Sequence, residues 1–225
     1  MSTAVIILTL NEIDGVKQIL PQIQRDGIDE MIVVDGGSTD GTIEEVKKMG
    51  ITIKKQTLKG HGGAILAGIE ETSSDNIIIF GPDGNHEPNE IRVLMDKISE
   101  GYDQVIISRF SKDSINLDAG KIDSFGNRFF TFLCNILFEG NLTDSLNESR
   151  VITRKAFREL QFDALGLDST LQMTIRGLKN KQKIIEIPGN EGRRIGGERK
   201  IQSFKTGRLL LKRIIIEFLR RDKKN

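Results

Sequence analysis

Short apolar runs and amphipathic segments alternate through the first half of the chain. We predict strands at the apolar runs, namely Ala4–Leu10, Met31–Val34, Ile51–Lys54, Asn76–Phe80 and Gln104–Ser108. The segments between them carry apolar residues at helical spacing, and we predict helices at Asp14–Arg25, Thr42–Met49, Gly63–Thr72 and Pro88–Glu100. Buried strands that are each followed by a helix are typical of a mostly parallel sheet covered on both faces. The predicted fold class is therefore α/β.

The second half is less regular but continues the same pattern. It predicts helices at Lys121–Phe138 and Asp168–Asn180, strands at Ser149–Thr153 and Lys183–Pro188, and a Gly- and Arg-rich loop at Arg193–Lys200. The chain then closes with a basic amphipathic helix. No low-complexity linker and no internal repeat divides the sequence, so we expect one domain over residues 1–202 and the closing helix over residues 203–225.

The composition is that of an ordinary globular protein. The 225 residues carry a net charge of +1, so no overall positive field favours binding to nucleic acid. The single cysteine, Cys134, lies in an apolar run and has no partner for an internal disulfide, which is typical of a reducing compartment. We find neither a signal peptide nor the roughly 18 unbroken apolar residues of a membrane span. The sequence therefore predicts a cytoplasmic protein.

The loops that follow the predicted strands hold the candidate chemistry, because ligands of parallel sheets bind at the carboxyl ends of the strands. Asp35–Thr42, after the second strand, is typical of a well-capped turn, and it also suits a site where Asp35 accepts hydrogen bonds from a base or ribose. Lys59–Ala64 precedes the third helix, and its glycines allow an anion to approach the helix start. It lacks the ending of a Walker loop, so the pattern is weak by itself.

The loop Phe80–Pro88 is the most informative of these segments. Asp83 and Asn85 are two residues apart, so both can present oxygens to one hard cation such as Mg²⁺ or Mn²⁺. The alternative is an ordinary Pro-Asp-Gly turn, which is a common turn sequence.

Several segments match, in the same order, the motifs of one known family: Thr9–Glu12, Val33–Thr42, Lys59–Gly68, Ser108–Phe110, Asp144 with Arg150, Glu186–Pro188 and Arg194–Lys200. Over Val5–Lys200 the chain resembles the family 2 glycosyltransferases, especially the branch of dolichyl-phosphate mannosyl- and glucosyltransferases. The resemblance implies a GT-A fold, with a Rossmann-like sheet flanked by helices. It also implies inverting transfer of a sugar from a UDP- or GDP-linked donor.

The resemblance further implies which residues contact the donor and the metal ion. The expected donor contacts are Thr9, Leu10, Asn11, Glu12, Asp35, Gly37, Ser38, Lys59, Gly60, Gly62, Arg194 and Lys200. The family's metal motif falls on Gly81–Asn85, so Asp83 and Asn85 would hold Mg²⁺ or Mn²⁺ while Gly81 replaces the first carboxylate. We interpret this as a modified site that binds the ion more weakly, with Arg194 and Lys200 sharing the charge of the diphosphate.

The resemblance also suggests a polyprenyl-phosphate or glycan acceptor. A phosphate is ionised at neutral pH and needs positive charge to hold it, and we predict Arg109 and Lys121 for this role. A hydroxyl acceptor needs a general base, for which Asp144 is the candidate, although a structural salt bridge is at least as good a role for it. The predicted catalytic residues are thus Asp83, Asp144 and Arg109. Two alternatives stay open: a sugar nucleotidyltransferase, and a relative that binds a nucleotide-sugar without catalysis.

The closing helix has two interpretations. Leu209–Arg221 is apolar but interrupted by Lys212 and Arg213, so it can pack on the domain or on the second subunit of a homodimer. Alternatively, it is an interfacial helix that holds the enzyme peripherally at the inner face of an anionic membrane. We favour the packed helix.

Overall fold

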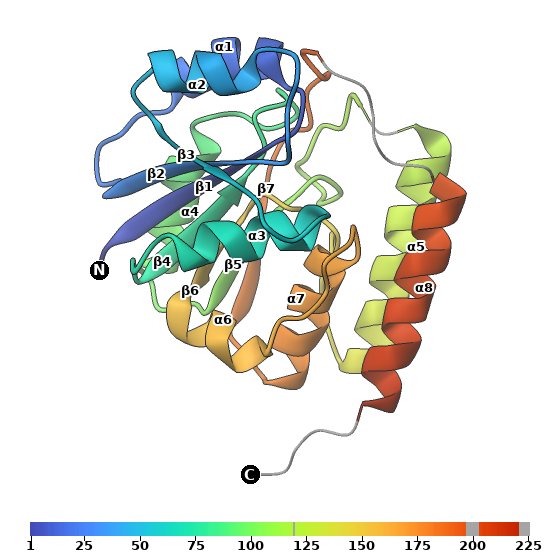
Figure 1. The fold of residues 1–225 in the computed structure, drawn as a ribbon. Coiled ribbons are helices and arrows are strands. Elements are labelled where there is room, and N and C mark those ends of the chain that lie inside the picture. The colour runs from blue at the N-terminus through green and yellow to red at the C-terminus, as the bar shows by residue number, and fades with distance from the viewer. Residues whose placement is uncertain (119, 197–202, 221–225) are drawn as a thin grey trace.

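A β-sheet forms the centre of the protein (Figure 1). The computed structural model describes residues 1–118, 120–196 and 203–220, and within them the sheet has seven strands in the order β3-β2-β1-β4-β6-β5-β7. These are β1 (Thr3–Thr9), β2 (Glu30–Asp35), β3 (Thr52–Lys55), β4 (Asn76–Phe80), β5 (Gln104–Ser108), β6 (Arg150–Thr153) and β7 (Ile184–Pro188). The prediction of a mostly parallel α/β sheet is confirmed.

Strand β6 runs against its neighbours. β1 pairs in parallel with β2 and β4, β2 with β3, and β5 with β7, whereas β6 is antiparallel to both β4 and β5. Val151 lies opposite Ile78 on one side and Val105 on the other. Because β6 is reversed, the residues that precede it, Asn147 and Glu148, lie at the edge where the parallel strands end. This is the edge at which such sheets bind ligands.

Helices cover both faces of the sheet (Figure 1). One apolar core joins the strands to α1 (Ile13–Ile19), α2 (Thr42–Lys48) and α4 (Glu90–Ile98). A second core joins them to α3 (His61–Glu70), α6 (Arg154–Leu160) and α7 (Ser169–Lys179). The side chains of successive strand residues point alternately to the two faces of the sheet. Val5 and Ile7 therefore belong to the first core, and Ile6 belongs to the second. This explains why the strands are apolar throughout.

Two further helices, α5 (Lys121–Phe138) and α8 (Ser203–Leu219), lie side by side at one side of the molecule (Figure 1). With α7 they form a third core that includes Phe130, Cys134, Leu171 and Leu210. Burial raises the pKa of the Cys134 thiol to about 12, so the thiol stays protonated and unreactive. Helix α8 packs against α5 and α7, while its outer face is exposed.

Two local predictions differ from the structure. The first helix ends at Ile19 because Leu20–Gln22 tighten into a 3-10 turn that contains a proline. The helix α6 has no counterpart in the prediction. It begins directly after β6, where Thr153 Oγ1 accepts a hydrogen bond from Ala156 N at 3.2 Å and so caps the first turn.

Candidate active site

A cavity of about 760 Å³ lies along the carboxyl edge of the sheet and extends to α5 and α8. Its volume is within the range of typical ligand sites. Its polar wall comes from the end of β1, from the loops after β1, β3, β4, β5 and β7, from the start of α3 and from the segment before β6. This wall includes Thr9, Glu12, His61, Asp83, Asn85, Arg109, Glu148, Glu191 and Arg194. Its apolar wall includes Phe110, Ile122, Phe125, Phe129, Phe204 and Leu210.

Asp35, at the end of β2, is the centre of the predicted nucleoside loop. Its carboxylate accepts hydrogen bonds from the N–H groups of Gly37 and Ser38, both at 2.8 Å, from the Ser38 hydroxyl, and from Thr9 Oγ1 at 3.1 Å. Asp35 is 1% exposed and does not belong to the cavity wall. The carboxylate therefore holds its own turn in shape, and its contact with a nucleoside stays a prediction.

The predicted donor residues divide into two groups. Those on the cavity wall are Thr9, Leu10, Glu12, Gly60 and Arg194. Those outside it are Asn11, Asp35, Gly37, Ser38, Lys59 and Gly62. Asn11 joins the first two loops, because its N–H donates to Ser38 Oγ and its side-chain oxygen accepts from Thr39 N, both at 2.8 Å. Lys200 lies outside the described residues.

The glycines at the start of α3 lie against other backbone segments. The N–H of Gly62 donates to the carbonyl oxygen of Leu165 at 2.9 Å, so it is not available to an anion. A Cβ atom on Gly62 would lie 1.8 Å from the carbonyl oxygen of Ala164. The geometry thus gives Gly62 a packing role in place of the predicted contact with the donor.

The loop after β4 places Asp83 and Asn85 on the cavity wall. The N–H of Asn85 donates to Asp83 Oδ1 at 3.1 Å, and Asn85 Oδ1 is buried with no hydrogen-bond donor among the described residues. Burial and the negative charge of Glu148 raise the pKa of Asp83, while Arg194 opposes them. A buried oxygen without a donor, next to a carboxylate whose charge is disfavoured, fits a cation.

Arg194 ties the loop after β7 to this carboxylate. Its guanidinium donates to Asp83 Oδ2 at 2.7 Å and to Glu12 Oε1 at 3.0 Å. The backbone of the same loop pairs with the loop after β4, because Ile195 N donates to the carbonyl oxygen of Asp83 at 2.8 Å. Arg194 therefore lies where the diphosphate and the metal ion of a donor complex are expected.

A divalent cation fits this site only in part. In residues 1–118, 120–196 and 203–220, no three His, Cys, Asp or Glu side chains are arranged to hold a metal ion. Asp83 and Asn85 offer the oxygen ligands that Mg²⁺ and Mn²⁺ prefer, and Mg²⁺ commonly keeps phosphate and water ligands as well. The residues fit an ion that is shared with a bound diphosphate.

Arg109, at the end of β5, is held by two carboxylates. Asp144 accepts from its Nε at 2.7 Å and its Nη2 at 3.1 Å, and Glu191 accepts from its Nη1 at 3.2 Å. Burial would raise the pKa of Asp144, but the charge and hydrogen bonds of Arg109 outweigh burial and lower it. A fully buried carboxylate with a lowered pKa is a poor proton acceptor, so the geometry favours the salt-bridge role of Asp144 over the role of a base.

The second predicted cation, Lys121, is exposed at the start of α5 and does not belong to the cavity wall. Arg128 lies about two turns further along α5 and shares an aromatic neighbour with Arg109. The guanidinium carbons of Arg128 and Arg109 lie 5.3 and 5.5 Å from the ring centre of Phe110, which lines the cavity. Arg109 thus lies on the cavity wall, Arg128 of α5 shares the Phe110 ring with it, and a phosphate-binding role for Lys121 stays a prediction.

Four acidic residues on the cavity wall were not predicted, namely Asp118, Asp123, Glu148 and Glu191. Glu148 Oε2 lies 2.6 Å from His61 Nε2, and His61 Nδ1 lies 2.7 Å from Ser169 Oγ. Burial would raise the pKa of Glu148, but the hydrogen bond and charge of His61, with more distant cations, lower it to about 2. The sequence offered one signal for a role of Glu148, because this charged residue directly precedes a predicted strand. The direction of that strand was unknown, so the end of the sheet at which Glu148 lies could not be predicted.

The other histidine, His86, is buried within the loop after β4. His86 Nδ1 lies 2.9 Å from Glu90 Oε2, and its Nε2 lies 3.0 Å from Asn147 Oδ1. The side-chain amide of Asn147 donates to the carbonyl oxygen of Ile107 at 2.7 Å, so its oxygen faces His86 as an acceptor. Burial would lower the pKa of His86, but the hydrogen bond and charge of Glu90 raise it. An imidazole that donates at both nitrogens is positively charged.

Comparison with known proteins agrees with this geometry. Residues 4–161 match the family described as "Glycosyl transferase family 2". The chain belongs to this family and is a glycosyltransferase. It is 26% identical over 226 residues to glycosyltransferase AglJ of Haloferax volcanii, covering 99% of this chain and 73% of the relative. The match favours use of a nucleotide-sugar over its synthesis, the alternative that the sequence left open.

A second relative of this glycosyltransferase is named for its substrates. The chain is 29% identical over 210 residues to the UDP-N-acetylglucosamine–dolichyl-phosphate N-acetylglucosaminyltransferase of Methanococcus voltae, covering 81% of this chain and 82% of the relative. Among solved structures it resembles glucosyl-3-phosphoglycerate synthase of Mycobacterium tuberculosis in complex with Mn²⁺, UDP and glucosyl-3-phosphoglycerate. That match has a TM-score of 0.76 at 21% identity and covers 99% of this chain and 81% of that one. This likeness shows the GT-A fold.

Proposed function

We propose that this glycosyltransferase transfers a sugar, with inversion, from a UDP- or GDP-linked donor to a polyprenyl phosphate. The observation that carries the proposal is the single cavity that joins the polar loops around Asp83 to the apolar wall on α5 and α8. A nucleotide-sugar is polar throughout, whereas a polyprenyl phosphate is polar only at its head. The two ends of the cavity match this pair, and the name of the Methanococcus voltae relative, which includes dolichyl phosphate, supports the acceptor.

At the polar end, Asp83 and Asn85 would hold Mg²⁺ or Mn²⁺ together with the donor diphosphate. The ion, when bound, neutralises the negative charge that grows on the departing nucleoside diphosphate. Arg194 is bonded to Asp83 and Glu12 and can transfer a hydrogen bond to a diphosphate that enters between them. Two positive groups would then share the charge of the leaving group.

The reaction needs no general base when the acceptor is a phosphate. An oxygen of the ionised phosphate bonds to the anomeric carbon of the sugar while the bond from that carbon to the diphosphate breaks, and the nucleoside diphosphate leaves. Asp144 and Glu191 use three of the five N–H groups of Arg109, so the remaining N–H groups can face the acceptor phosphate. Asp144 then positions Arg109 and transfers no proton.

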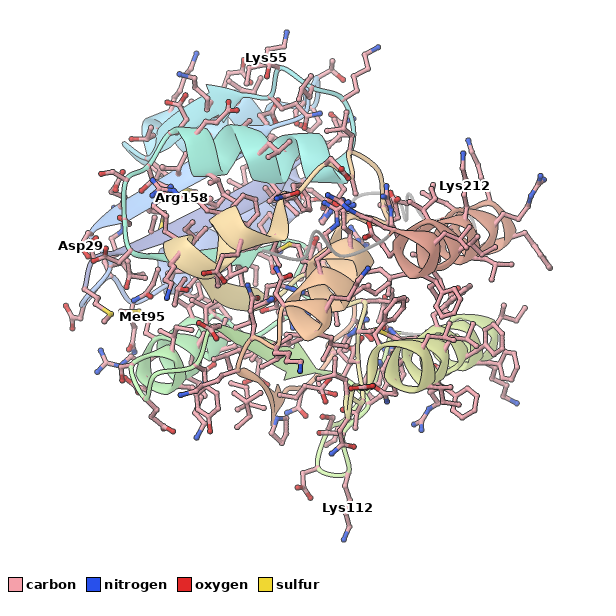
Figure 2. All side chains as sticks on the ribbon, turned by 90° about the horizontal axis from the view of Figure 1, so that it is seen from below. Asp29, Lys55, Met95, Lys112, Arg158 and Lys212 are labelled. Atoms are coloured by element: carbon pink, nitrogen blue, oxygen red, sulfur yellow. The ribbon has the colours of Figure 1, made fainter. Side chains whose placement is uncertain are left out.

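The outer face of α5 and α8 is unusually apolar. We call it the α5–α8 surface, and its exposed members are Ile122, Phe125, Phe129, Phe132, Ile136, Phe204, Leu211, Ile215, Phe218 and Leu219. Exposed basic residues of the same helices include Arg128, Lys205, Arg208 and Lys212, and Figure 2 shows Lys212 pointing outward from α8. None of the described helices has the length and apolarity of a membrane span.

Large apolar patches next to basic residues are suited to the surface of an anionic membrane. The α5–α8 surface also continues the apolar wall of the cavity, because Ile122, Phe125, Phe129 and Phe204 belong to both. We propose that this surface rests on the inner face of the membrane, where a polyprenyl phosphate can enter the cavity without leaving the lipid. The enzyme would thus be cytoplasmic and peripheral, and a homodimer through the same surface is the competing outcome.

A transfer assay in vesicles tests the function. Protein, Mn²⁺ and radioactive UDP- or GDP-linked sugars are incubated with anionic vesicles that contain a polyprenyl phosphate, and label is counted in the lipid extract. We expect label in the extract only when the polyprenyl phosphate is present, and a loss of at least ~10-fold in Asp83→Asn. Vesicles of the same phospholipids without it are the control. Equal labelling of both vesicle types, or transfer only to water-soluble acceptors, would contradict the proposed acceptor.

A further inference from the structure

We propose that Glu148 supplies the metal-site carboxylate that the loop after β4 lacks at Gly81. The inference rests on the proposed function, because it concerns the cation that the same site would share with the donor. It assigns to Glu148 a role that the motif around Gly81 and Asp83 does not show, since the two segments are far apart in the sequence.

The side chain of Glu148 occupies the space that a side chain at position 81 would need. A Cβ atom on Gly81 would lie 2.5 Å from Glu148 Oε1 and 3.9 Å from Asp83 Oδ1. A carboxylate oxygen of Glu148 therefore already stands where an aspartate at position 81 would begin, and an oxygen of Asp83 lies within 4 Å of the same point. The reversed direction of β6 explains how it reaches this place, because the residue before that strand lies at the carboxyl edge of the sheet.

The oxygens around this point are arranged for a cation. Glu148 Oε2 is bonded to His61 Nε2 at 2.6 Å, whereas Glu148 Oε1 lies next to Gly81. Asn85 Oδ1 is buried without a donor among the described residues, and Asp83, Asn85 and Glu148 all line the cavity. Two carboxylates that both approach position 81 repel each other, and a divalent ion bound to both would relieve the repulsion.

The backbone that carries Glu148 is held rigidly. Arg150 is fully buried, and its Nε donates to the carbonyl oxygen of Asn147 at 3.1 Å while its Nη1 donates to Thr174 Oγ1 at 3.1 Å. The side chain of Asn147 in turn donates to the carbonyl oxygen of Ile107 at 2.7 Å. These bonds fix the chain on both sides of Glu148, as expected of a ligand that must be in place before the ion arrives.

A simpler role for Glu148 is to hold His61 at the start of α3. That role uses Oε2 alone and makes no demand on position 81. The metal role makes a further demand, because the two positions should be exchangeable: a carboxylate placed at 81 should replace the one removed from 148, provided that the collision between them is removed too. The exchange distinguishes the two roles.

The experiment measures Mn²⁺ binding by the full chain from the electron paramagnetic resonance signal of the free ion, with UDP present in one series and GDP in another. Glu148→Gln keeps the size of the side chain and an oxygen for His61. We expect its Mn²⁺ affinity to fall at least ~10-fold, the smallest loss expected when a group that supports a metal site is removed. Glu87→Gln, which removes an exposed carboxylate from the loop after β4, is the matched control and should bind Mn²⁺ like the wild type.

The exchange variant Gly81→Asp with Glu148→Ala should regain most of the affinity that Glu148→Ala alone loses. Gly81→Asp alone should lower the melting temperature, because its Cβ collides with Glu148 Oε1. Wild-type affinity in Glu148→Gln, in a preparation where Asp83→Asn weakens binding, would overturn the inference and leave the proposed metal site intact. An exchange variant no better than Glu148→Ala would overturn it as well. If Asp83→Asn also binds like the wild type, the metal site of the proposed function is wrong, and the role of Glu148 falls with it.

Discussion

Replacing Asp144 by asparagine separates a positioning role of this carboxylate from a role as a general base. Asp144 is fully buried and accepts from the Arg109 side chain at 2.7 and 3.1 Å and from Asn127 Nδ2 at 2.9 Å. Asparagine has the same shape, but it removes the charge and turns one acceptor into a donor. An N–H group of Arg109 or Asn127 would then face the N–H group of the new asparagine in the protein interior.

The size of the effect follows from the contacts. Removing one partner of a buried ion pair costs about 3–5 kcal/mol. Arg109 keeps Glu191 at 3.2 Å and is 18% exposed at its side chain, so we expect the lower end, about 3 kcal/mol. In a chain of this size such a loss lowers the melting temperature by about 6–12 °C. Native proteins are stable by about 5–15 kcal/mol, so the variant should remain folded.

Thermal unfolding and steady-state kinetics measure the two consequences together. We expect the lower melting temperature and a higher KM for the polyprenyl phosphate, because Arg109 loses its orientation, while the pH profile of kcat keeps its shape. Asp96→Asn is the control, since it breaks an exposed pair with Arg92 and should change stability by less than about 1 kcal/mol. An Asp144→Asn protein that melts like the wild type but loses kcat, together with the acidic limb of its pH profile, would refute the reasoning and restore Asp144 as a base.

Three further variants test other parts of the account. Burial would raise the pKa of Glu217, but hydrogen bonds from two neighbours lower it below 4.5, so Glu217→Gln should reduce the free energy of unfolding by about 1–3 kcal/mol at pH 7. Because the pKa is lowered in the folded state, that difference should shrink as the pH falls below 4.5 through the folded value. Gly62→Ala should cost about 1–3 kcal/mol or more in thermal unfolding, since its Cβ would lie 1.8 Å from the carbonyl oxygen of Ala164. The double variant Phe125→Ser with Phe218→Ser should weaken cosedimentation with anionic vesicles at least ~10-fold at an unchanged melting temperature. Both rings are exposed, and burial of each in the membrane would contribute about 1.5–3 kcal/mol to the free energy of binding.

Each of these variants has a counterpart elsewhere in the chain. Glu100→Gln removes an exposed carboxylate, and a similar loss there would show that Glu217 is not special. Gly126→Ala makes the same change in α5, where nothing lies within 4 Å, and should not destabilise the protein. Val93→Ser removes an exposed apolar side chain from α4 and should leave vesicle binding unchanged. Equal vesicle binding by the double Phe variant and the wild type, with a dimer in solution, would assign the α5–α8 surface to a second subunit.

The parallel half of the fold could be predicted because local pattern and global structure agree there. Runs such as Asn76–Phe80 are apolar on both faces and are followed by a helix, which is typical of a covered parallel sheet. The direction of β6 could not be predicted in this way. Val151 and Ile152 are buried on both faces as well, and an apolar run of four residues has the same pattern in either direction.

Whether the direction of a strand could be predicted also decides which residues of the candidate site could be predicted. Asp83, Asn85 and Arg109 follow directly after strands whose direction was predicted, and all three lie on the cavity wall. Glu148 precedes a reversed strand, so its place at the same edge was hidden. The prediction that Gly62 contacts the donor rested on its lack of a side chain, which allows a close approach either by a ligand or by another backbone segment. In the structure, the backbone of Ala164 makes this close approach.

The central claim is that the acceptor is a phosphate, and the bond formed in the product tests it most directly. Phosphorus and proton nuclear magnetic resonance of the purified lipid product report both the linkage and the configuration of the sugar. We predict a phosphodiester between the polyprenyl phosphate and the anomeric carbon, with the configuration opposite to that of the donor. A sugar attached to a hydroxyl oxygen, or a phosphodiester that retains the configuration of the donor, would contradict the account.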